Sequence, residues 1–411
     1  MSEALHVVVV GGGAAGLIAA GFAARRGYRV TVVERNERPA RKVMITGKGR
    51  CNLTNDSSPA DCIEQVPGNG RFLYSAFSAF SPRNTMELFT ELGVPLKTER
   101  GKRVFPVSDK AVDVVDALVR FARSGGVKFV TGRVSRLLLE EGVCCGVELE
   151  NGRQLSAYGV IVCTGGCSYP GTGSTGDGYE LARQAGHTVI PPRPSLVPLV
   201  IQESFCGDLQ GLSLRNCTLT AVDTVTGKTV FRELGEMLFT HFGVSGPLVL
   251  SASAHMRDMA PERYRLSIDL KPALTPEQVD ARLVRELEIK PNACVGNAMA
   301  AVLPRSLIAP ALQLAAVAGE TKCHSVSRAE RQRIGVVLKA LPLTVVGFRP
   351  LAEAIVTAGG VSTRELNSKT MASRLVSGLS FAGEVIDVDA YTGGFNLQIA
   401  FSTGAAAGNH I

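Results

Sequence analysis

The sequence predicts an α/β fold in which a doubly wound parallel sheet is interrupted by an inserted segment. Residues 5–10 form an apolar run, residues 14–26 an alanine-rich helical segment and residues 29–33 a β-branched run, which together are typical of a βαβ unit. The pattern changes to antiparallel strands after Pro191-Pro192 and returns to α/β character after Pro342. The expected bounds are 1–191 and 346–411 for the first domain and 192–345 for the insert.

Turn and capping residues indicate the other elements of the first domain. Ser81 followed by Pro82 is typical of a helix N-cap and first turn, and Ser108 begins a second helix that runs to about residue 124. The dipeptide Asn151-Gly152 lies between two alternating runs and predicts a hairpin within a β-meander of residues 127–163. A strand at residues 379–382 and a helix at about 395–407 complete the domain.

The insert contains two kinds of segment. Residues 196–201, 214–225 and 228–239 alternate as antiparallel strands do. Farther along, Thr275 with Gln278 and Ser327 with Glu330 have the spacing of capping boxes. We therefore expect strands in the first half of the insert and helices in the second half.

Composition excludes several classes of protein. With 45% hydrophobic and 20% charged residues among 411, the chain is not disordered, collagen-like or a coiled-coil rod. The 44 Lys and Arg exceed the 37 Asp and Glu by 7, which falls short of a nucleic-acid-binding footprint. The 10 cysteines include no C-x-x-C pair, and no run of about 18 apolar residues occurs. We expect a cytoplasmic protein without a metal site or a membrane partner, and the sequence leaves its oligomeric state open.

The run Gly11-Gly12-Gly13-Ala14-Ala15-Gly16 fits the dinucleotide fingerprint G-x-G-x-x-G in its proper place between a strand and a helix. The first glycine makes the turn, the second lets the backbone approach a diphosphate and the third lets the helix pack on the strand. Glu34 ends the second strand, where an acidic residue accepts hydrogen bonds from a ribose. The sequence therefore predicts dinucleotide binding, with an ordinary glycine-rich turn as the alternative.

A second match, Gly171-Thr172-Gly173-Ser174-Thr175-Gly176, lacks this context. It follows the polar turn Ser168-Tyr169-Pro170 rather than a strand, and no acidic strand end follows it at the required distance. We expect this segment to cover part of the active site or to start a helix at about Asp177.

The fingerprint alone does not distinguish FAD from NAD or NADP. Basic residues (Arg41, Lys42, Lys48 and Arg50) surround the glycine-rich stretch 46–49 soon after Glu34, either to contact an extended cofactor or as a solvated basic loop. Gly383-Glu384 follows a strand, and Gly393-Gly394 opens a helix whose positive end suits the pyrimidine side of a flavin. These separate segments favour FAD.

Several motifs also carry a family resemblance. The residues that carry it are Arg41-Lys42, Thr46 to Asn55, Cys163 to Gly166, Phe239 to His241 with Ser245 to Pro247, Phe381 to Val388, and Gly393 to Gln398. Together they resemble the BaiN/RdsA/aminoacetone-oxidase-like family of bacterial FAD enzymes. The resemblance implies a Rossmann-like FAD-binding domain of the glutathione-reductase-like type. It also implies an insert made of a small β-barrel, expected at 192–272, and a helical part, expected at 273–342.

The fingerprint and the resemblance together predict which residues bind FAD. The set is Gly11, Gly13, Ala14, Ala15, Gly16, Glu34, Arg35, Arg41, Lys42, Gly49, Arg50, Cys51, Asn52, Leu53, Val134, Thr164, Gly165, Gly166, Gly383, Glu384, Asn396, Leu397 and Gln398. Lys48 and Cys163 depart from residues common in the family, and neither departure is expected to abolish binding.

Four residues are candidates for catalysis, and His241, Cys51 and Tyr391 are favoured among them. His241 ends a predicted strand of the insert beside a glycine-rich turn, and its alternative role is to stabilise that turn. Cys51 lies in the basic loop, where a cysteine more often packs than reacts. Tyr391 precedes the glycine pair at 393–394 and is a possible proton donor, as is Tyr169 beside the second glycine motif.

These observations favour an FAD-dependent reductase that transfers hydride to an activated C=C bond of a small or steroid-like enone. NADH or NADPH is the expected transient electron donor, since only one dinucleotide fold is predicted. The alternatives are a flavin-dependent amine oxidase and a dihydrouridine synthase acting on ribosomal RNA. RNA is less favoured, because few aromatic residues are present and basic runs such as Arg328, Arg331 and Arg333 are usually solvated helix faces.

Overall fold

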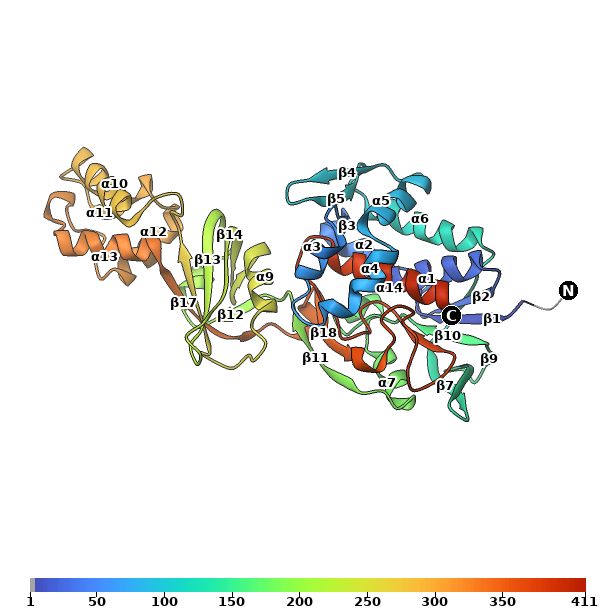
Figure 1. Ribbon diagram of the computed structural model, residues 1–411. Coiled ribbons are helices and arrows are strands. Elements are labelled where there is room, and N and C mark those ends of the chain that lie inside the picture. The colour runs from blue at the N-terminus through green and yellow to red at the C-terminus, as the bar shows by residue number, and fades with distance from the viewer. Residues whose placement is uncertain (1–3) are drawn as a thin grey trace. The chain divides into compact units, whose positions relative to one another are not determined.

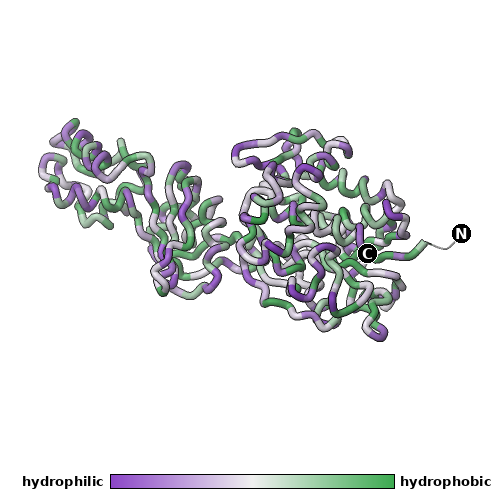
Figure 2. The backbone as a smooth tube through the Cα atoms, in the orientation of Figure 1, coloured by the Kyte–Doolittle hydropathy of each residue, from purple (hydrophilic) through white to green (hydrophobic). Residues whose placement is uncertain are grey.

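The computed structural model describes residues 4–411 and divides them into two compact units (Figure 1). The first unit comprises the chain up to Ser195 together with Leu351–Ile411, and the second is Leu196–Pro350. Pro191 and Pro192, where the insert was expected to begin, lie inside strand β11 of the first unit. Apolar segments run through the interior of each unit (Figure 2).

A parallel five-stranded sheet forms the centre of the first unit. Its strands are β1 (His6–Val10), β2 (Arg29–Glu34), β6 (Lys128–Thr131), β10 (Gly159–Val162) and β19 (Leu379–Phe381), in the order β19-β10-β1-β2-β6. Strand β1 pairs with β10 on one side and with β2 on the other. Both pairings bury valine and isoleucine side chains, as expected for parallel strands covered on both faces. The predicted βαβ start and doubly wound class are confirmed.

Glycines allow helices α1 (Ala14–Arg25) and α14 (Phe395–His410) to pack backbone against backbone. A Cβ atom at Gly404 would lie 2.4 Å from the carbonyl oxygen of Ala15, and one at Gly408 would lie 2.3 Å from that of Ala19. Helix α6 (Ala111–Ser124) also contacts α1, where Gly21 leaves room for the ring of Phe121. The first helix is therefore held on two sides.

The other elements of the first unit surround this core. Its short helices are α2 (Arg41–Ile45), α3 (Pro59–Glu64), α4 (Tyr74–Ala79), α5 (Pro82–Glu91) and α7 (Asp177–Gln184), with 3-10 turns η1 (Thr46–Gly49), η2 (Gly70–Leu73), η3 (Pro170–Thr172), η6 (Leu351–Glu353) and η7 (Thr363–Glu365). Its smaller sheets are β3 (Thr54–Asn55), β5 (Arg103–Pro106) and β4 (Leu96–Glu99); β7 (Val134–Glu140), β8 (Val143–Leu149) and β9 (Gln154–Ser156); and β11 (Val189–Ser195) with β18 (Val356–Val361). Ser81 caps α5 as predicted, whereas α6 begins at Ala111 rather than near Ser108, because Asp109 has a φ of 55°.

The second unit contains a closed six-stranded barrel. Its strands are β12 (Leu199–Ile201), β13 (Ser213–Asp223), β14 (Thr229–Thr240), β15 (Gly243–Ser245), β16 (Tyr264–Asp269) and β17 (Leu341–Phe348), with short helices α8 (Phe205–Asp208) and α9 (Pro247–Ala254). Strand β17 pairs with β12 and β16 and so closes the barrel. The barrel therefore extends beyond the expected bounds 192–272, because its last strand follows the helical part in the sequence.

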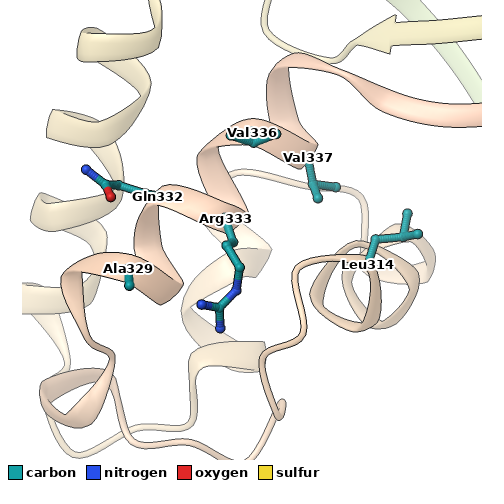
Figure 3. A pocket seen from close by; sticks show the side chains of 6 residues that line it. All are labelled: Leu314, Ala329, Gln332, Arg333, Val336 and Val337. Atoms are coloured by element: carbon teal, nitrogen blue, oxygen red, sulfur yellow. The ribbon is translucent and has the colours of Figure 1, made fainter.

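The helical part lies between β16 and β17 in the chain. It consists of α10 (Pro276–Ile289), α11 (Val295–Ala298), η4 (Met299–Ala301), α12 (Arg305–Leu314), η5 (Cys323–Ser325) and α13 (Arg328–Lys339). The predicted capping boxes at Thr275 and Ser327 are both present. A shallow depression on this part, shown in Figure 3, is lined by Leu314, Ala329, Gln332, Arg333, Val336 and Val337. It includes none of the residues that the sequence predicts to bind FAD or to catalyse.

Helix α14 and the other helices of the described chain fall short of the length and apolar character needed to cross a bilayer.

A buried histidine joins two separate parts of the first unit. The Nε2 atom of His187 lies 2.7 Å from Oγ of Ser373, and its Nδ1 atom lies 3.1 Å from Oε2 of Glu365. The ring also packs edge-on against Phe381 of β19, with 5.0 Å between ring centroids. Burial lowers the pKa of His187 below its ordinary value of 6.5, and the hydrogen bond to the carboxylate of Glu365 only partly offsets that effect.

We predict that His187 makes the protein less stable in acid. The unfolded chain takes up a proton as the pH falls through about 6.5, whereas the folded chain resists protonation until a lower pH. The melting temperature of the wild type is therefore expected to fall between about pH 7.5 and pH 5.5, and that of His187→Gln to fall less. His6 and His255 also have lowered pKa values, so the difference between the two proteins is the quantity to measure. Equal slopes for both proteins would contradict this assignment.

Candidate functional site

The predicted cofactor residues gather at one edge of the central sheet. Strands β10, β1 and β2 are parallel neighbours, so their carboxyl ends lie side by side. The loops that follow these three ends begin at Cys163, Gly11 and Arg35, and β19 on the other side of β10 leads into Gly383. Ligands of open parallel sheets bind outside this edge. The fold therefore brings most of the predicted set together.

The glycines of the first motif are required for different structural reasons. Gly11 has a φ of 97°, and a Cβ atom there would lie 2.6 Å from the carbonyl oxygen of Cys163. A Cβ atom at Gly16 would lie 1.9 Å from the carbonyl oxygen of Gly11. The protein itself thus requires glycine at these two positions, for the turn and for close helix packing.

Gly13 is different, because the protein leaves space beside it. It is the N-cap of α1 with a φ of -78°, and a Cβ atom there would lie 4.0 Å from its nearest neighbour, the carbonyl oxygen of Cys163. Ala14 and Ala15 follow in the first turn, whose free N–H groups favour an anion. The space in front of α1 fits the diphosphate that the fingerprint predicts.

Glu34 is oriented toward the glycine turn by its neighbours. Its Oε2 atom accepts a hydrogen bond of 2.7 Å from the backbone N–H of Gly12. Its Oε1 atom accepts hydrogen bonds of 2.8 Å from the backbone and side-chain nitrogens of Asn36. Each carboxylate oxygen can accept about two hydrogen bonds, so Oε2 retains a position for a ribose hydroxyl.

Two predicted residues are joined by an ion pair across the sequence. The Nζ atom of Lys42, in α2, lies 2.8 Å from Oε2 of Glu384 and also donates to Oγ of Ser168 at 2.6 Å. Glu384 accepts a further hydrogen bond of 2.8 Å from the backbone N–H of Thr357. Ser168 and Thr357 were not predicted, and no motif surrounds Thr357 in the sequence. The contacts connect the loops after β2, β10 and β19.

The basic loop is engaged in contacts of its own. The guanidinium of Arg50 donates to Glu99 and Asp109, at 2.5 and 2.6 Å, and lies 4.2 Å from the ring centroid of Phe105. These contacts hold the pKa values of both carboxyl groups below their ordinary range, with Lys97 contributing most to Asp109. The side chain of Arg50 is therefore committed to the sheet β3-β5-β4, and only its backbone is left for a cofactor. Arg41 is exposed and donates to Asn36.

Cys51 does not have the properties of a reactive thiol. Its side chain is fully buried, and burial raises its pKa to about 12. The thiolate is the reactive form, so a cysteine in this environment stays protonated at neutral pH. The catalytic hypothesis for Cys51 is corrected to a packing role beside Leu53, which is also fully buried.

Unpaired polar atoms provide a test of whether a cofactor fits here. Within residues 4–411, the Oδ1 atom of Asn52 and the Oγ1 atom of Thr164 are buried and have no hydrogen-bond partner. Leaving a buried polar atom unpaired costs about 1–3 kcal/mol, so such atoms commonly meet a ligand or ordered water. Both residues belong to the predicted FAD-binding set. These atoms and the space at Gly13 fit a bound dinucleotide.

The predicted FAD-binding residues near the C-terminus include Gly383 and Asn396, which both form hydrogen bonds within the protein. Gly383 has a φ of 79°, and its N–H donates to Oγ1 of Thr403 at 2.9 Å. Asn396 hydrogen-bonds the backbone of Ala390 in both directions, which braces the loop before α14. Leu397 is half-buried.

Gln398 is a correction to the predicted set. Its fully buried side-chain amide accepts hydrogen bonds from Thr54 and Thr85 through Oε1. Through Nε2 it donates to Ser402 at 2.9 Å and to the carbonyl oxygen of Phe80 at 3.2 Å. All four positions of the amide are thereby used inside the protein, so the side chain does not face a cofactor. Gln398 and Ser402 are four residues apart on α14, and this polar pair on one helix face was the available signal.

The remaining candidates lie on other segments of the chain. Val134 is buried at the start of β7, and Tyr391 is half-buried with its backbone N–H donating to Gln65. His241 belongs to the second unit, in the turn between β14 and β15. Its exposed ring lies edge-on to Phe242 with 4.9 Å between centroids.

Comparisons with known proteins identify the family of the chain. The model of the HI0933-like protein Rossmann domain matches residues 5–410. The chain belongs to the HI0933-like family. HI0933-like proteins are FAD-dependent oxidoreductases, so the chain is a flavoprotein with a Rossmann-type FAD-binding fold, and the resemblance noted from the motifs is confirmed.

Relatives of this HI0933-like chain match it over nearly its whole length. It is 33% identical to the 3-dehydro-bile acid delta(4,6)-reductase of Clostridium scindens, covering 98% of each chain. It is 32% identical to the ribosomal RNA dihydrouridine synthase of Escherichia coli, covering 100% of this chain and 98% of the relative.

The fold is similar to that of solved flavoenzymes. The 3-ketosteroid-delta4-(5alpha)-dehydrogenase of Rhodococcus jostii matches with a TM-score of 0.52, at 16% identity over 99% of this chain and 98% of the other. The 3-ketosteroid delta1-dehydrogenase of Sterolibacterium denitrificans matches with a TM-score of 0.54, at 13% identity over 100% and 99%. At these identities the likeness concerns the fold alone.

Proposed function

We propose that this HI0933-like protein reduces a C=C bond conjugated to a carbonyl group, with NADH or NADPH as the electron donor. The observation that carries the proposal is that two full-length relatives with different substrates share this chemistry by name. A 3-dehydro bile acid with delta(4,6) double bonds is an enone system, and dihydrouridine is formed when the C=C bond beside a uracil carbonyl is saturated. A small or steroid-like enone is the substrate class that we favour.

The chain's own residues have separate roles in this proposal. The turn Gly11 to Gly16 holds the diphosphate of FAD, and Glu34 accepts hydrogen bonds from its ribose. Bound FAD supplies hydride transfer to the electron-poor carbon. His241 donates the proton to the neighbouring carbon, with Tyr391 as the alternative donor.

The nicotinamide donor is proposed to bind only transiently. The second glycine motif forms the 3-10 turn η3 and leads into α7, and it does not follow a strand as a dinucleotide turn does. NADH or NADPH would then bind during its own half-reaction and leave before the substrate arrives. We also propose a cytoplasmic location, since all ten cysteines are free.

Reduction of uracil in ribosomal RNA is the second candidate. It is favoured by the match to the Escherichia coli synthase and by a similar match, 32% identical, to the Haemophilus influenzae protein of the same name. Binding to RNA neutralises phosphates with Lys and Arg, so its affinity falls steeply with salt, whereas binding of an uncharged enone does not.

An anaerobic two-step experiment tests the proposal. The FAD-loaded protein is mixed with NADH, NADPH or a panel of amines, and loss of the oxidised flavin absorbance is followed. The reduced protein is then mixed with a steroid enone, with ribosomal RNA fragments or with oxygen. We expect rapid reduction by one nicotinamide and rapid reoxidation by the enone. Reduction by an amine alone, followed by reoxidation with oxygen only, would show an oxidase and contradict the proposal.

A further inference from the structure

The second glycine motif has no role in the function described so far. Residues 170–177, called the strap below, run from η3 into the first residue of α7. Tyr169 before it and Gly173 and Gly176 within it all have positive φ, of 51°, 104° and 86°. The strap therefore folds back sharply instead of extending away from the unit.

One side of the strap contacts the loop after β10. The backbone N–H of Gly176 donates to the carbonyl oxygen of Gly166 at 3.2 Å. Oγ of Ser174, which is buried, lies 3.1 Å from the position that a Cβ atom would take at Gly165. Gly165 and Gly166 belong to the predicted FAD-binding set, so the strap packs directly on that loop.

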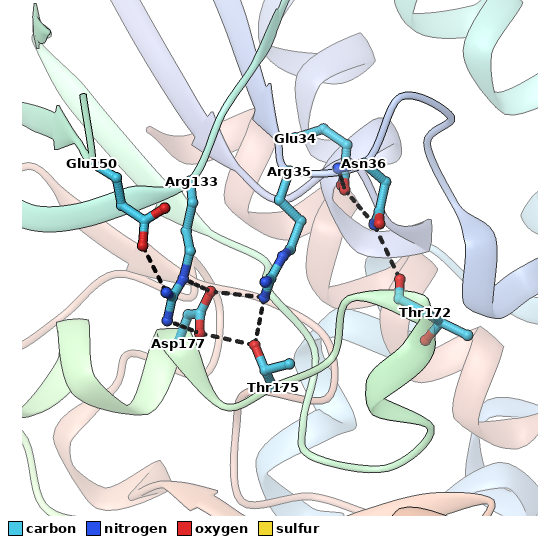
Figure 4. A network of polar contacts seen from close by, with 8 residues as sticks. All are labelled: Glu34, Arg35, Asn36, Arg133, Glu150, Thr172, Thr175 and Asp177. Carbon is cyan, nitrogen blue, oxygen red and sulfur yellow. Dashed lines mark hydrogen bonds and ion pairs between the residues drawn. The ribbon is translucent and has the colours of Figure 1, made fainter.

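The other side of the strap contacts the loop after β2, as Figure 4 shows. Asn36 donates through Nδ2 to the carbonyl oxygen of Thr172 at 3.1 Å, and Arg35 donates through Nη1 to Oγ1 of Thr175 at 2.6 Å. A Cβ atom at Gly173 would lie 2.6 Å from Nδ2 of Asn36, which explains why this position needs glycine. Asn36 also holds Glu34, the predicted ribose acceptor, through two hydrogen bonds.

The order of the strands determines what the strap crosses. Strand β1 lies between β10 and β2 in the sheet. A segment attached both to the loop after β10 and to the loop after β2 therefore passes over the carboxyl end of β1. That end carries the turn Gly11 to Gly13. Two strand spacings amount to about 10 Å, which a segment of this length easily spans.

Asp177 fastens the end of the strap. It accepts hydrogen bonds from Arg133 at 2.8 and 2.9 Å, forms an ion pair of 3.3 Å with Arg35 and accepts from Thr175 at 2.9 Å. Burial raises the pKa of this carboxyl, but hydrogen bonds from Arg133 and Thr175 outweigh burial and hold the pKa below its ordinary value. Arg35 directly follows Glu34, the predicted ribose acceptor, and Arg133 directly precedes Val134, another residue of the predicted FAD-binding set.

We propose that the strap closes the adenosine end of the FAD site and sets the rate at which FAD leaves. Arg35, Asn36 and Arg133 are its positioning residues, and Asp177 is the carboxylate that joins two of them. The inference rests on FAD being the cofactor and is independent of the substrate. It therefore stands or fails separately from the proposed reductase activity.

The experiment measures the rate of FAD dissociation from the holoprotein. The holoprotein is diluted into a large volume of buffer without apoprotein, and the fluorescence of the released flavin is followed over time. Asp177→Asn keeps the size of the side chain and removes the charge that holds two arginines, and we expect dissociation to be about 10-fold faster. Thr175→Val removes one exposed hydroxyl that contacts both Arg35 and Asp177, and we expect a smaller acceleration, of about 3-fold.

Glu180→Gln is the matched control, because Glu180 lies on the same helix α7 and forms an exposed pair with Arg183. Its dissociation rate is expected to equal that of the wild type. The melting temperature of each apoprotein shows whether a variant has lost stability in general. Dissociation rates within 2-fold of the wild type for both Asp177→Asn and Thr175→Val would overturn the proposal. So would acceleration that merely parallels a lower melting temperature of the apoproteins.

Discussion

A Gly13→Val protein is expected to fold and to hold no FAD. The backbone of Gly13 has a φ of -78° and a ψ of -168°, a conformation that valine readily adopts. A Cβ atom there is 4.0 Å from its closest contact in the protein, so the substitution disturbs little of the apoprotein. The same side chain fills the space in front of α1 that the diphosphate needs. We expect FAD affinity to fall at least about 100-fold, which corresponds to about 2.7 kcal/mol.

Gly16→Ala provides the contrast. Its Cβ atom would lie 1.9 Å from the carbonyl oxygen of Gly11, so this substitution is expected to lower the melting temperature of the apoprotein itself. Flavin content after purification and the melting temperature of the apoprotein together separate the two effects. A Gly13→Val protein that retains stoichiometric FAD would show that the diphosphate lies elsewhere.

Local patterns explain why the structure of residues 6–34 could be predicted. The strand, the glycine turn, the helix and the second strand depend on neighbours within a few residues, and the first motif provides them in order. Helix starts at Ser81, Thr275 and Ser327 were predictable for the same reason, because a capping side chain hydrogen-bonds three residues along the chain.

Contacts between distant residues could not be predicted in this way. Lys42 and Glu384 are separated by 342 positions, and nothing near either residue indicates the other. Strand β17 completes the barrel only after four α-helices have intervened in the sequence. The antiparallel pattern of the first five barrel strands therefore ends before the barrel is complete. In both cases the deciding partner is brought near by the tertiary fold.

The motifs Thr46 to Asn55 and Gly393 to Gln398 were assigned to the cofactor, yet several of their polar side chains form hydrogen bonds between the two motifs. Thr54 donates to Gln398, and Asn55 donates to the carbonyl oxygen of Gly393. A Cβ atom at Gly394 would lie 2.3 Å from the carbonyl oxygen of Thr54. Part of the family pattern therefore maintains the start of α14. A motif seen in sequence alone does not separate such bracing from ligand contact.

His241→Ala is expected to slow reoxidation of the reduced protein by its enone substrate by about 100-fold or more. Saturating a C=C bond requires a proton as well as a hydride, and a positioned general acid typically contributes about 10²–10⁴-fold. Reduction of the FAD by nicotinamide involves no proton transfer to the substrate carbon, so that half-reaction should change little. Stopped-flow absorbance measures the two half-reactions separately.

Variants of two other residues help to distinguish a general-acid role of His241 from a structural role. His324→Ala replaces another exposed histidine of the second unit, and both half-reactions should keep their rates. Tyr391→Phe removes the alternative donor, and it should slow reoxidation only if His241→Ala does not. Equal losses in both half-reactions of His241→Ala would instead assign His241 to stabilising the turn between β14 and β15.

The exposure of the His241 ring allows one further test of the same prediction. Because the ring lies at the surface of its turn and contacts Phe242, its removal leaves a position that solvent and small molecules reach. Added imidazole should therefore restore part of the reoxidation rate in His241→Ala if the missing group is the acid. The restored rate should rise with the concentration of the imidazolium form, since only that form can donate a proton. A turn that has lost its structure would not respond to imidazole, so the absence of rescue together with losses in both half-reactions would remove His241 from the chemistry.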